Sequence, residues 1–325
     1  MLGWRRAFAV AAGTLLAVAA LGVNSACAQT WPQRPVKVIL TLGPGSGTDI
    51  GMRLFADRLP KFWNQPVVIE NRPGGDGLVA ITTFLSANDD HVLLGVPVSS
   101  FTAHPYVIPN LSYKQSDLAP IARGWNVIIV IAVPASLPVN SLKELVELTK
   151  AQPGKLNWAG TTGAIDFLFA GFLKKHGLDM ARVPYRNPQD AATDLATERI
   201  QVCEASLATL RPQLEAGKIK LLAVTNTTRA PSHPNLPTTN EAGFPELTLD
   251  GLVGLFGQPS MPMGLREKIA ADMREVSKDP IIADRLSATG QVLNVGTAAE
   301  FNLSIEDQRR TVGAAAKDLG LAPLQ

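Results

Sequence analysis

The sequence predicts an α/β fold with two lobes. Three observations support this: β-rich runs alternate with helical patterns, Gly-rich loops follow several of the runs, and two long apolar runs lie where the chain could cross between lobes. Alternation of this kind predicts mixed, mostly parallel sheets covered by helices on both faces. A chain of 325 residues is also long for one hydrophobic core and sufficient for two.

The N-terminal elements follow the order strand, loop, helix. We expect the first strands at Val36–Leu40, Pro66–Glu70 and Val92–Val96. The first strand breaks at the loop 43–47, after which Thr48 or Asp49 opens a helix with one apolar face. The second strand ends in the turn-rich loop 71–77, which leads into a helix over 78–85.

The rest of the chain continues the alternation. Trp125–Val133 and Gly251–Gly257 are the two runs that could each cross from one lobe to the other. Ser141 and Glu144 have the spacing of a capping box, so we expect a helix to begin there and to end at Pro153-Gly154. Further strands are expected at 156–159, 182–184, 200–203, 220–224 and 292–295, and further helices at 165–176, 265–277, 280–289 and from the Thr297–Glu300 capping box onward.

The first residues predict export. Two arginines precede the uncharged apolar run Ala7–Val23, and Ala26-Cys27-Ala28 is the small-residue pattern that signal peptidase cleaves. We therefore expect residues 1–28 to be a cleaved signal peptide and the mature protein to be periplasmic. The alternatives fit less well, because the run is short for a membrane anchor and Asn24 stands where a lipoprotein signal needs a large aliphatic residue.

Charge and cysteine content exclude several classes of protein. The chain has 30 basic and 28 acidic residues, and the leader holds two of the basic ones, so the mature chain is formally neutral. Neutrality argues against non-specific binding to nucleic acid or to an anionic membrane. Without the leader, Cys203 is the one cysteine, which excludes an internal disulfide and a Cys-rich metal site. We interpret Cys203 as an inert core thiol on a strand.

The loop Pro44–Asp49 is the most informative motif. Gly45 and Gly47 let a ligand approach the backbone, Ser46 and Thr48 add hydroxyl donors, and the amides that follow lie at the start of a helix. The spacing matches neither a nucleotide P-loop nor a dinucleotide fingerprint, and Pro44 excludes a nucleophile elbow. We expect anion binding here, with Asp49 more suited to capping the helix than to ligand contact.

A second segment, Leu156–His176, repeats the order of the first: strand, Gly-containing loop, Asp, apolar helix. Thr161 and Thr162 can donate hydroxyl hydrogen bonds to a carboxylate, whereas ionised Asp166 repels an anion and accepts from an ammonium or hydroxyl group. Any α/β protein repeats such a unit, so the repeat alone is compatible with a purely structural role. The functional interpretation is that each lobe directs one helix N-terminus at a shared cleft.

The residues needed for catalysis are not grouped in the sequence. The four histidines lack metal-site spacing, so no metal or other cofactor is expected. Cys203 has no neighbouring base, and Glu204 beside it is interpreted as a polar group at a strand end. His91 could form a local pair with Asp89-Asp90, but a solvated turn is the simpler interpretation. We therefore expect a protein that is not an enzyme.

Short motifs along the mature chain resemble the Bug/TctC family, the extracytoplasmic receptors of tripartite tricarboxylate transporters. The matching segments run in order as Trp31–Pro35, Pro44–Asp49, Glu70–Gly74, Asp117–Ile121, Pro153–Asn157, Val183–Arg186, Ala216–Lys218, Leu222–Thr225, Pro237–Thr238 and Glu241–Pro245. Each segment is short, but their number, order and spacing together carry the resemblance.

The resemblance implies a type II periplasmic-binding-protein fold whose two lobes close on a ligand by a hinge motion. It places lobe 1 at residues 29–124 and 252–325 and lobe 2 at 125–251. The implied ligand is a small carboxylate bound by the loops Pro44–Asp49 and Gly160–Asp166, with Ser99 and Ser206 in the wall. The implied partners are the membrane subunits of a transporter, and a sensing co-receptor for a membrane histidine kinase is the alternative.

The chain departs from the family pattern in the second loop. Ile165, Asp166 and Phe167 replace hydroxyl residues, and Leu168 stands where many members have His. The frequent Asp after the 200–203 strand is Ala205 here. The second loop is therefore more apolar than in the family and carries an added acid.

Overall fold

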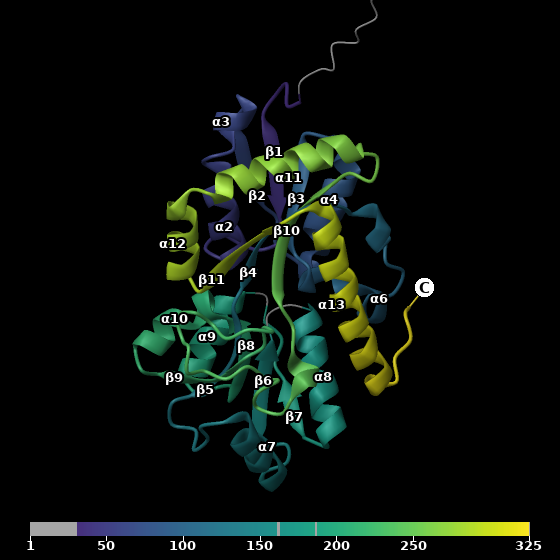
Figure 1. Ribbon diagram of the computed structural model, residues 1–325. Helices are drawn as coiled ribbons and strands as arrows, with labels where there is room; N and C mark the ends of the chain where they lie inside the picture. The colour runs from purple at the N-terminus through teal and green to yellow at the C-terminus, as the bar shows by residue number, and fades with distance from the viewer. Residues whose placement is uncertain (1–30, 161–162, 186, 325) are drawn as a thin grey trace, which may run out of the picture. The chain divides into compact units, whose positions relative to one another are not determined.

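The computed structural model describes residues 31–160, 163–185 and 187–324 (Figure 1). By its contacts the chain divides into residues 1–33 and 34–325, and the following description concerns the second of these units. The predicted signal peptide, Thr161 and Thr162 lie outside the described residues. None of the helices within the described ranges combines the length and the apolar composition that spanning a membrane requires.

The first lobe is built on a six-stranded mixed sheet in the order β11-β4-β10-β3-β1-β2. Its strands are β1 Val36–Leu40, β2 Val67–Asn71, β3 Val92–Pro97, β4 Ala119–Val127, β10 Gly251–Gly257 and β11 Gln291–Gly296. Strand β1 pairs in parallel with β2 and β3, whereas β10 pairs antiparallel with β3 and β4. The early strands are therefore joined by helical crossovers, and β10 returns to them from the second lobe.

Helices pack against this sheet. They are α2 Gly47–Ala56, α3 Pro60–Trp63, α4 Leu78–Ala87, α5 Ser99–Thr102, α6 His104–Val107, α11 Met263–Ser277, α12 Pro280–Ala288 and α13 Ala298–Leu319, with single turns η1 Gly75–Gly77 and η2 Gln115–Asp117. The predicted capping box opens α13: Thr297 Oγ accepts from the Glu300 N–H at 3.2 Å, and Glu300 accepts in return from the Thr297 N–H at 2.7 Å. The sequence signature therefore identified the start of the longest helix correctly.

The second lobe has a five-stranded mixed sheet in the order β7-β6-β8-β5-β9. Its strands are β5 Ile129–Pro134, β6 Leu156–Gly160, β7 Met180–Arg182, β8 Val202–Ser206 and β9 Ile219–Val224, and its helices are α7 Leu142–Ala151, α8 Gly163–His176, α9 Pro188–Ala196 and α10 Leu207–Glu215, with the turn η3 Pro245–Leu247. Strands β7 and β8 pair with β6 in parallel. Both sheets are mixed and lie in separate lobes, which confirms the predicted two-lobe α/β fold.

The predicted crossing strand Trp125–Val133 is two strands rather than one. The break is at Ile128, whose N–H donates to Gly290 O at 3.1 Å and whose carbonyl accepts from the Leu207 N–H at 2.8 Å. The buried side chain of Asn226 bridges the break, because its Oδ1 accepts from Ile129 N at 2.9 Å and its Nδ2 donates to Val127 O at 3.0 Å. The chain therefore changes sheets at a fixed point. The lobe boundaries at 124/125 and 251/252 stay a prediction, and both fall inside strands.

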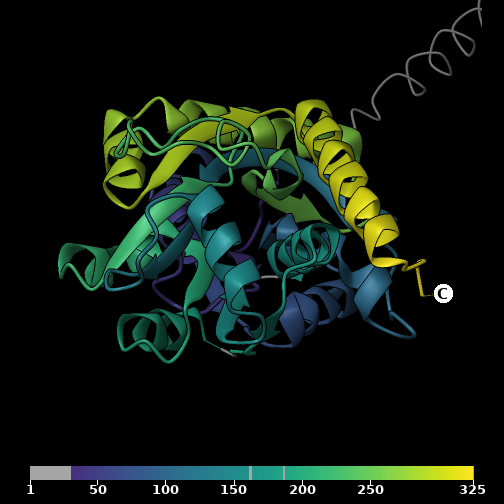
Figure 2. The ribbon, with the colours of Figure 1, turned by 90° about the horizontal axis from the view of Figure 1, so that it is seen from below.

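Separate apolar cores fill the two lobes, and a further cluster joins them. Phe84, Phe101, Phe256 and Phe301 are fully buried in the first lobe. The joining cluster packs Phe167 and Leu168 of α8 with Val312 and Ala316 of α13, which lie side by side (Figures 1 and 2). Burying a side chain such as Phe or Leu contributes roughly 1.5–3 kcal/mol, so Phe167 and Leu168 stabilise the contact between the lobes.

Candidate functional site

The loop before α2 forms the first lip of the site, defined here as residues 43–49. Ser46 is the N-cap of α2, because its Oγ accepts from the Asp49 N–H at 3.2 Å while its backbone is extended. The expectation that Thr48 or Asp49 opens the helix was therefore wrong by one to two residues. A Ser at this position is favoured because its short side chain reaches an N–H that the helix itself leaves unpaired.

The carboxylate of Asp49 is fully engaged by its own lobe. It accepts from Gly45 N at 3.0 Å, Arg53 Nε at 3.0 Å and Asn71 Nδ2 at 2.9 Å. Burial raises the pKa of Asp49, but the hydrogen bonds from Arg53, Gly45 and Asn71 outweigh it, so the pKa lies below its ordinary value. The side chain is ionised and fixes the loop, and its oxygens are directed at these donors.

Unpaired donors remain on the same lip. Among the described residues, the backbone N–H groups of Gly47 and Thr48 have no acceptor, as expected for the first turn of a helix. The buried hydroxyl of Thr48 also has no partner within the described ranges. The N–H of Gly45 is taken by Asp49, so of the expected donors Gly47, Thr48 and the hydroxyl of Ser46 are the ones available to an anion.

The remaining predicted wall residues lie at other helix starts. Ser206 is the N-cap of α10, with its Oγ accepting from Thr209 N at 3.1 Å. Ser99 is buried at the start of α5, two residues beyond β3. The crossing point links α2 to α10: a methyl group on Gly47 would lie 3.3 Å from Gln291 Oε1, and one on Gly290 would lie 3.0 Å from Leu207 Cδ2. The starts of α2 and α10 therefore approach the same turn between α12 and β11.

The second lip, defined here as residues 160–166, is occupied by an acid from the first lobe. Gly163 begins α8, and its N–H donates to Asp76 Oδ1 at 3.1 Å. A side chain at Gly163 would collide with this carboxylate, because its Cβ would lie 2.1 Å from Asp76 Oδ2. The sequence interpretation did not single out Asp76, although the glycines beside it indicated an unusual loop. The resident carboxylate uses the first described amide of α8.

The buried side chain of His104 forms a hydrogen bond with the backbone of Asp76. His104 Nε2 lies 3.1 Å from Asp76 O, and His104 Nδ1 lies 2.8 Å from the hydroxyl of Tyr113. Burial lowers the pKa of His104, which favours the neutral ring. Because Nε2 must donate to the Asp76 carbonyl, Nδ1 of the neutral ring accepts from the Tyr113 hydroxyl. Asp76 has φ 54°, a left-handed conformation that is unfavourable for a residue with a side chain. The loop 71–77 therefore holds Asp76 in an unfavourable backbone conformation while its carboxylate binds the Gly163 N–H.

Asp166 lies in the first turn of α8 and forms an ion pair with Arg182, the last residue of β7. Its environment differs from that of Asp49: burial raises the pKa of Asp166 above its ordinary value, and the hydrogen bond from Arg182 only partly offsets this effect. The carboxylate also lies directly over the end of β6, since a Cβ on Gly160 would be 2.2 Å from Asp166 Oδ1. Asp166 thus connects the first turn of α8 to the end of β7.

The sequence interpretation placed Glu204 wrongly. It is the middle residue of β8, not a strand end, and is only 2% exposed. Its Oε2 has no hydrogen-bond partner among the described residues. Burial, and then the charge of Asp166, raise the pKa of Glu204 well above its ordinary value. An acid within an apolar strand was the available signal, because a central strand buries both of its faces.

The neighbouring electrostatics follow from the same burial. Cys203 is fully buried on β8, and burial raises its pKa to about 12, so it is the unreactive core thiol that was predicted. Burial likewise raises the pKa of Asp76 to about 6, with the charge of Asp166 adding to the effect and the Gly163 N–H and Arg182 opposing it. Three carboxylates from three chain segments, those of Asp76, Asp166 and Glu204, thus lie at the second lip.

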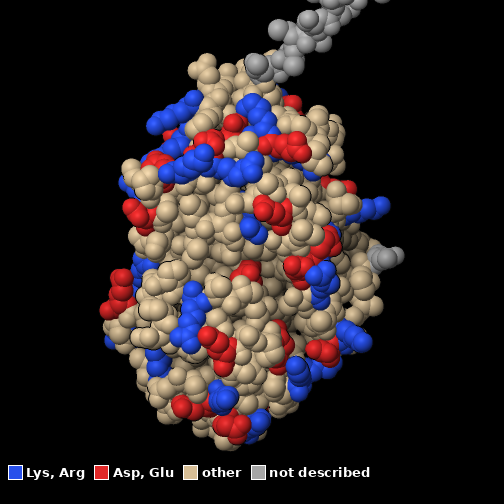
Figure 3. All heavy atoms as spheres, viewed as in Figure 1, with Lys and Arg blue, Asp and Glu red and all other residues tan. Residues whose placement is uncertain are grey.

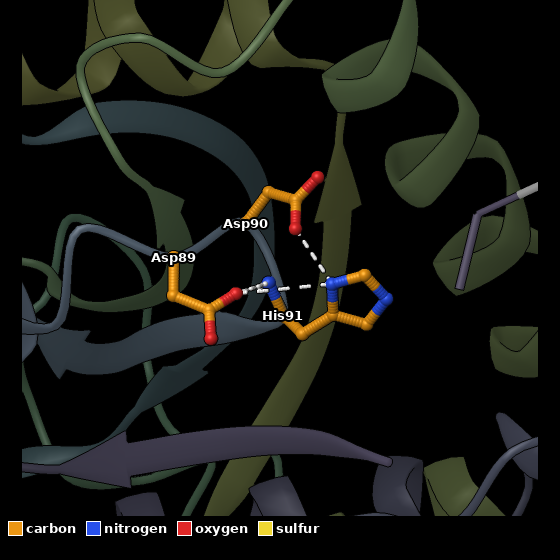
Figure 4. Close-up of side chains that lie close together, drawn as sticks. All are labelled: Asp89, Asp90 and His91. Carbon is orange, nitrogen blue, oxygen red and sulfur yellow. Dashed lines mark hydrogen bonds and ion pairs between the residues drawn. The ribbon is translucent and has the colours of Figure 1, made fainter. Parts of the chain in front are cut away.

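Asp89, Asp90 and His91 also lie close together (Figure 4). Asp89 Oδ1 accepts from the His91 N–H at 2.8 Å and from Arg34 at 2.6 Å, while Asp90 Oδ1 lies 2.6 Å from His91 Nδ1. The carboxylates are thus used within the turn and by Arg34. The structure therefore shows a local pair of His91 with Asp90, and the predicted solvated turn is wrong for His91, which is 8% exposed.

Neither the cavities nor the charged surface offers a better candidate binding site than the two lips. A cavity of about 360 Å³ lies between η2 and α13 and one of about 230 Å³ between α8 and α13, and neither is lined by residues 43–49 or by Glu204. On the face in Figure 3, acidic and basic side chains are intermixed, as expected for a chain without a dominant charge. The unpaired donors and acids remain the chemically distinctive groups.

Comparisons with known proteins agree with the two-lobe architecture. The profile described as "Tripartite tricarboxylate transporter family receptor", TctC, matches residues 52–321. A protein of the UPF0065 group from Bordetella pertussis is 29% identical over 307 residues, covering 93% of this chain and 95% of its own.

Two solved structures extend these comparisons to the fold. A structure described as a periplasmic transporter is 27% identical with a TM-score of 0.81, covering 91% of this chain and 100% of its own. The R. palustris protein Rpa4515, solved with adipate, is 25% identical with a TM-score of 0.80, covering 90% of this chain and 100% of its own. The resemblance expected from the sequence motifs is confirmed.

Proposed function

We infer the function of the chain from its family: it belongs to the TctC family, the receptors of tripartite tricarboxylate transporters. We propose that it is a periplasmic solute-binding receptor that captures a small organic carboxylate and delivers it to the membrane subunits of such a transporter. The related Rpa4515 was solved with adipate, a dicarboxylate, which supports a ligand of this class.

The observation that supports carboxylate binding is the set of unpaired donors at the start of α2. The N–H groups of Gly47 and Thr48 and the hydroxyl of Thr48 lack acceptors among the described residues, and the Ser46 hydroxyl can still donate. Asp49 accepts instead from Gly45, Arg53 and Asn71, so its carboxylate leaves these donors unoccupied. A carboxylate here gains charge-assisted hydrogen bonds and the favourable end of the helix dipole.

The N-terminal sequence supports the periplasmic location. Residues 1–28 have the pattern of a cleaved signal peptide, and related proteins are periplasmic. The alternative function is that of a ligand-sensing co-receptor, whose partner is a membrane histidine kinase. We propose no catalytic step, because the residues of the two lips supply binding groups and not a nucleophile with its base.

The test is isothermal titration calorimetry of the mature protein with a panel of carboxylates of three to eight carbons, adipate included. We expect at least one to bind, and the variant Ser46→Ala/Thr48→Val to bind it at least ten-fold more weakly, because hydrogen bonds to a charged group contribute roughly 1.5–3 kcal/mol each.

Thr193→Val on α9 is the matched control, since it removes a helix hydroxyl bonded only to Gln189 O and should leave affinity unchanged. The companion variant Ser46→Ala/Thr161→Val tests the predicted contribution of the second loop. Failure of every carboxylate to bind, or wild-type affinity in Ser46→Ala/Thr48→Val, contradicts the proposal.

A further inference from the structure

We propose that the second lip binds a cation: an ammonium group of the ligand is held by Asp166 and Glu204 while the ligand's carboxylate binds at the start of α2. This inference rests on the proposed function and deepens it, because it specifies an ammonium-bearing carboxylate as the ligand. It assigns opposite polarities to the two ends of the binding site.

One donor that a second carboxylate could use is already taken by an acid of the protein. The Gly163 N–H, the first described amide of α8, donates to Asp76 Oδ1 at 3.1 Å. A ligand carboxylate entering here would compete with Asp76 and would face the charge of Asp166. In the described part of the second lip, an incoming carboxylate would therefore meet the negative charges of Asp76 and Asp166.

The register of the sheet directs Glu204 toward Asp166. Gly160 and Glu204 are partners in the parallel pairing of β6 with β8, so their side-chain positions lie on the same face of the sheet. Asp166 Oδ1 lies over that face of Gly160, 2.2 Å from where a Cβ would be. The missing side chain of Gly160 thus leaves room for the Asp166 carboxylate on the face of the sheet that carries Glu204.

The unpaired oxygen of Glu204 is the observation that points to a ligand. The residue is 2% exposed, and Oε2 has no partner among the described residues, while Val202 on the same face of β8 is packed in the apolar core. Burying an unpaired acid is costly, and an apolar residue at this position would pack without that cost. A donor that arrives with the ligand supplies the missing partner.

The charges that face this pair leave it acidic. Arg182 is bonded to Asp166 through Oδ2, and Asp76 faces Asp166 from the first lobe. Among the described residues these carboxylates do not form a cluster tight enough to enclose a metal ion, whereas Asp89, Asp90 and His91 do. An ammonium group needs no such cage, because it donates separate hydrogen bonds to individual carboxylates.

A shared proton between Asp166 and Glu204 is the competing explanation, and it makes a different prediction. If a proton bridges the two acids, Glu204→Gln keeps an N–H donor in the same place and ligand preference does not change. If the pair binds an ammonium group, the same variant removes an acceptor and adds a donor, and the preference for the cation is lost.

The experiment measures ligand preference by calorimetry at pH 7.5. Each amino carboxylate of three to eight carbons is compared with the dicarboxylate and the unsubstituted carboxylate of the same carbon number. We expect the best amino carboxylate to bind at least ten-fold more tightly than both of its matched acids. Glu204→Gln and Asp166→Asn should each abolish this preference, while Glu215→Gln, an exposed acid on α10, should preserve it.

Each result of the calorimetry supports or contradicts the cation site. A matched dicarboxylate that binds as tightly as the amino carboxylate overturns the cation site and leaves the proposed function intact. A retained preference in folded Glu204→Gln favours the shared proton and overturns the assignment to this pair. If no compound of the panel binds, the proposed function fails and the inference fails with it. Thermal unfolding of each variant verifies that it is folded, and Asp166→Asn decides the question if Glu204→Gln does not fold.

Discussion

The two lips are built from the same local pattern and have opposite electrostatics. Each has a parallel strand, a loop with glycine, an acid in the first turn and an apolar helix: β1 with Asp49 in α2, and β6 with Asp166 in α8. At the first lip the pKa of the acid is lowered, and at the second it is raised. The first lip leaves donors unpaired, whereas the second leaves acceptors unpaired.

The difference comes from residues distant in the sequence. Asp49 receives Arg53 from its own helix and Asn71 from the end of β2, so its charge is satisfied by donors. Asp166 receives Arg182 but lies beside Glu204 of β8, and Asp76 reaches α8 from the other lobe. Identical local motifs therefore acquire different chemistry from the strands placed next to them.

Removing the acid of the first lip should produce the largest effect. Asp49→Ala deletes three hydrogen bonds from a side chain that is 4% exposed and leaves Arg53 without its carboxylate. We expect a loss of about 2–3 kcal/mol in the free energy of unfolding, because Gly45 N and Asn71 Nδ2 each lose an acceptor, whereas Arg53, whose side chain is 49% exposed, becomes solvated at little cost. Urea unfolding followed by circular dichroism measures this loss.

Asp49→Asn is the matched variant for this prediction. It keeps one acceptor for the Gly45 N–H while removing the charge, so its loss should be smaller than that of Asp49→Ala. Equal losses in the two variants would mean that the carboxylate charge contributes little, and the contrast between the lips would then not be electrostatic in origin.

Adding a methyl group should distinguish the lips by the space that each leaves. At Gly160 the new Cβ would lie 2.2 Å from Asp166 Oδ1, so Gly160→Ala must displace that carboxylate from Arg182, and we expect a loss of about 2 kcal/mol. At Gly43 of the first lip nothing lies within 4 Å, and Gly43→Ala should change the stability by less than about 0.5 kcal/mol.

A double-mutant cycle assigns the cause of this loss. If the carboxylate is the obstacle, Gly160→Ala/Asp166→Ala should lose less than the sum of the two single variants. Strict additivity in thermal or urea unfolding would place the strain in the backbone near Gly160 instead.

Much of the fold followed from local patterns, and most of the site did not. Alternating runs predicted the strands β1, β2 and β3 within about two residues, and capping signatures located α7 and α13. The first half of β4 was missed because Pro120, Arg123 and Gly124 interrupt its apolar pattern, and α9 and α10 were missed as well. These elements depend on tertiary pairing, which local propensity does not report.

The site shows the same division. The bonds of Asp49 to Gly45 and Arg53 span four residues each, so the helix motif made its structural role predictable. Asp76 and Glu204 were missed because their significance depends on a contact between lobes and on the pairing of β8 with β6. Sequence periodicity carries no information about which strands become neighbours.

The last predicted effect distinguishes the lips by the pH dependence of stability. The pKa of Glu204 is raised by burial, so in the folded state this group holds its proton at pH values where the unfolded chain has released it. Its contribution to stability is complete below the ordinary Glu pKa and is lost as the pH rises toward the folded value, at about 1.4 kcal/mol per pH unit.

Glu204→Gln removes this slope, so its stability relative to wild type should increase steadily from about pH 5 upward, where urea unfolding measures it. Asp49→Asn should behave oppositely, because the lowered pKa of Asp49 makes wild type gain stability as the pH rises through the acid range. Parallel stability–pH curves for wild type and Glu204→Gln would show that Glu204 is ionised at little cost. Glu204 would then be an ionised acceptor like Asp166, and burial of Glu204 would not distinguish the two lips by pH.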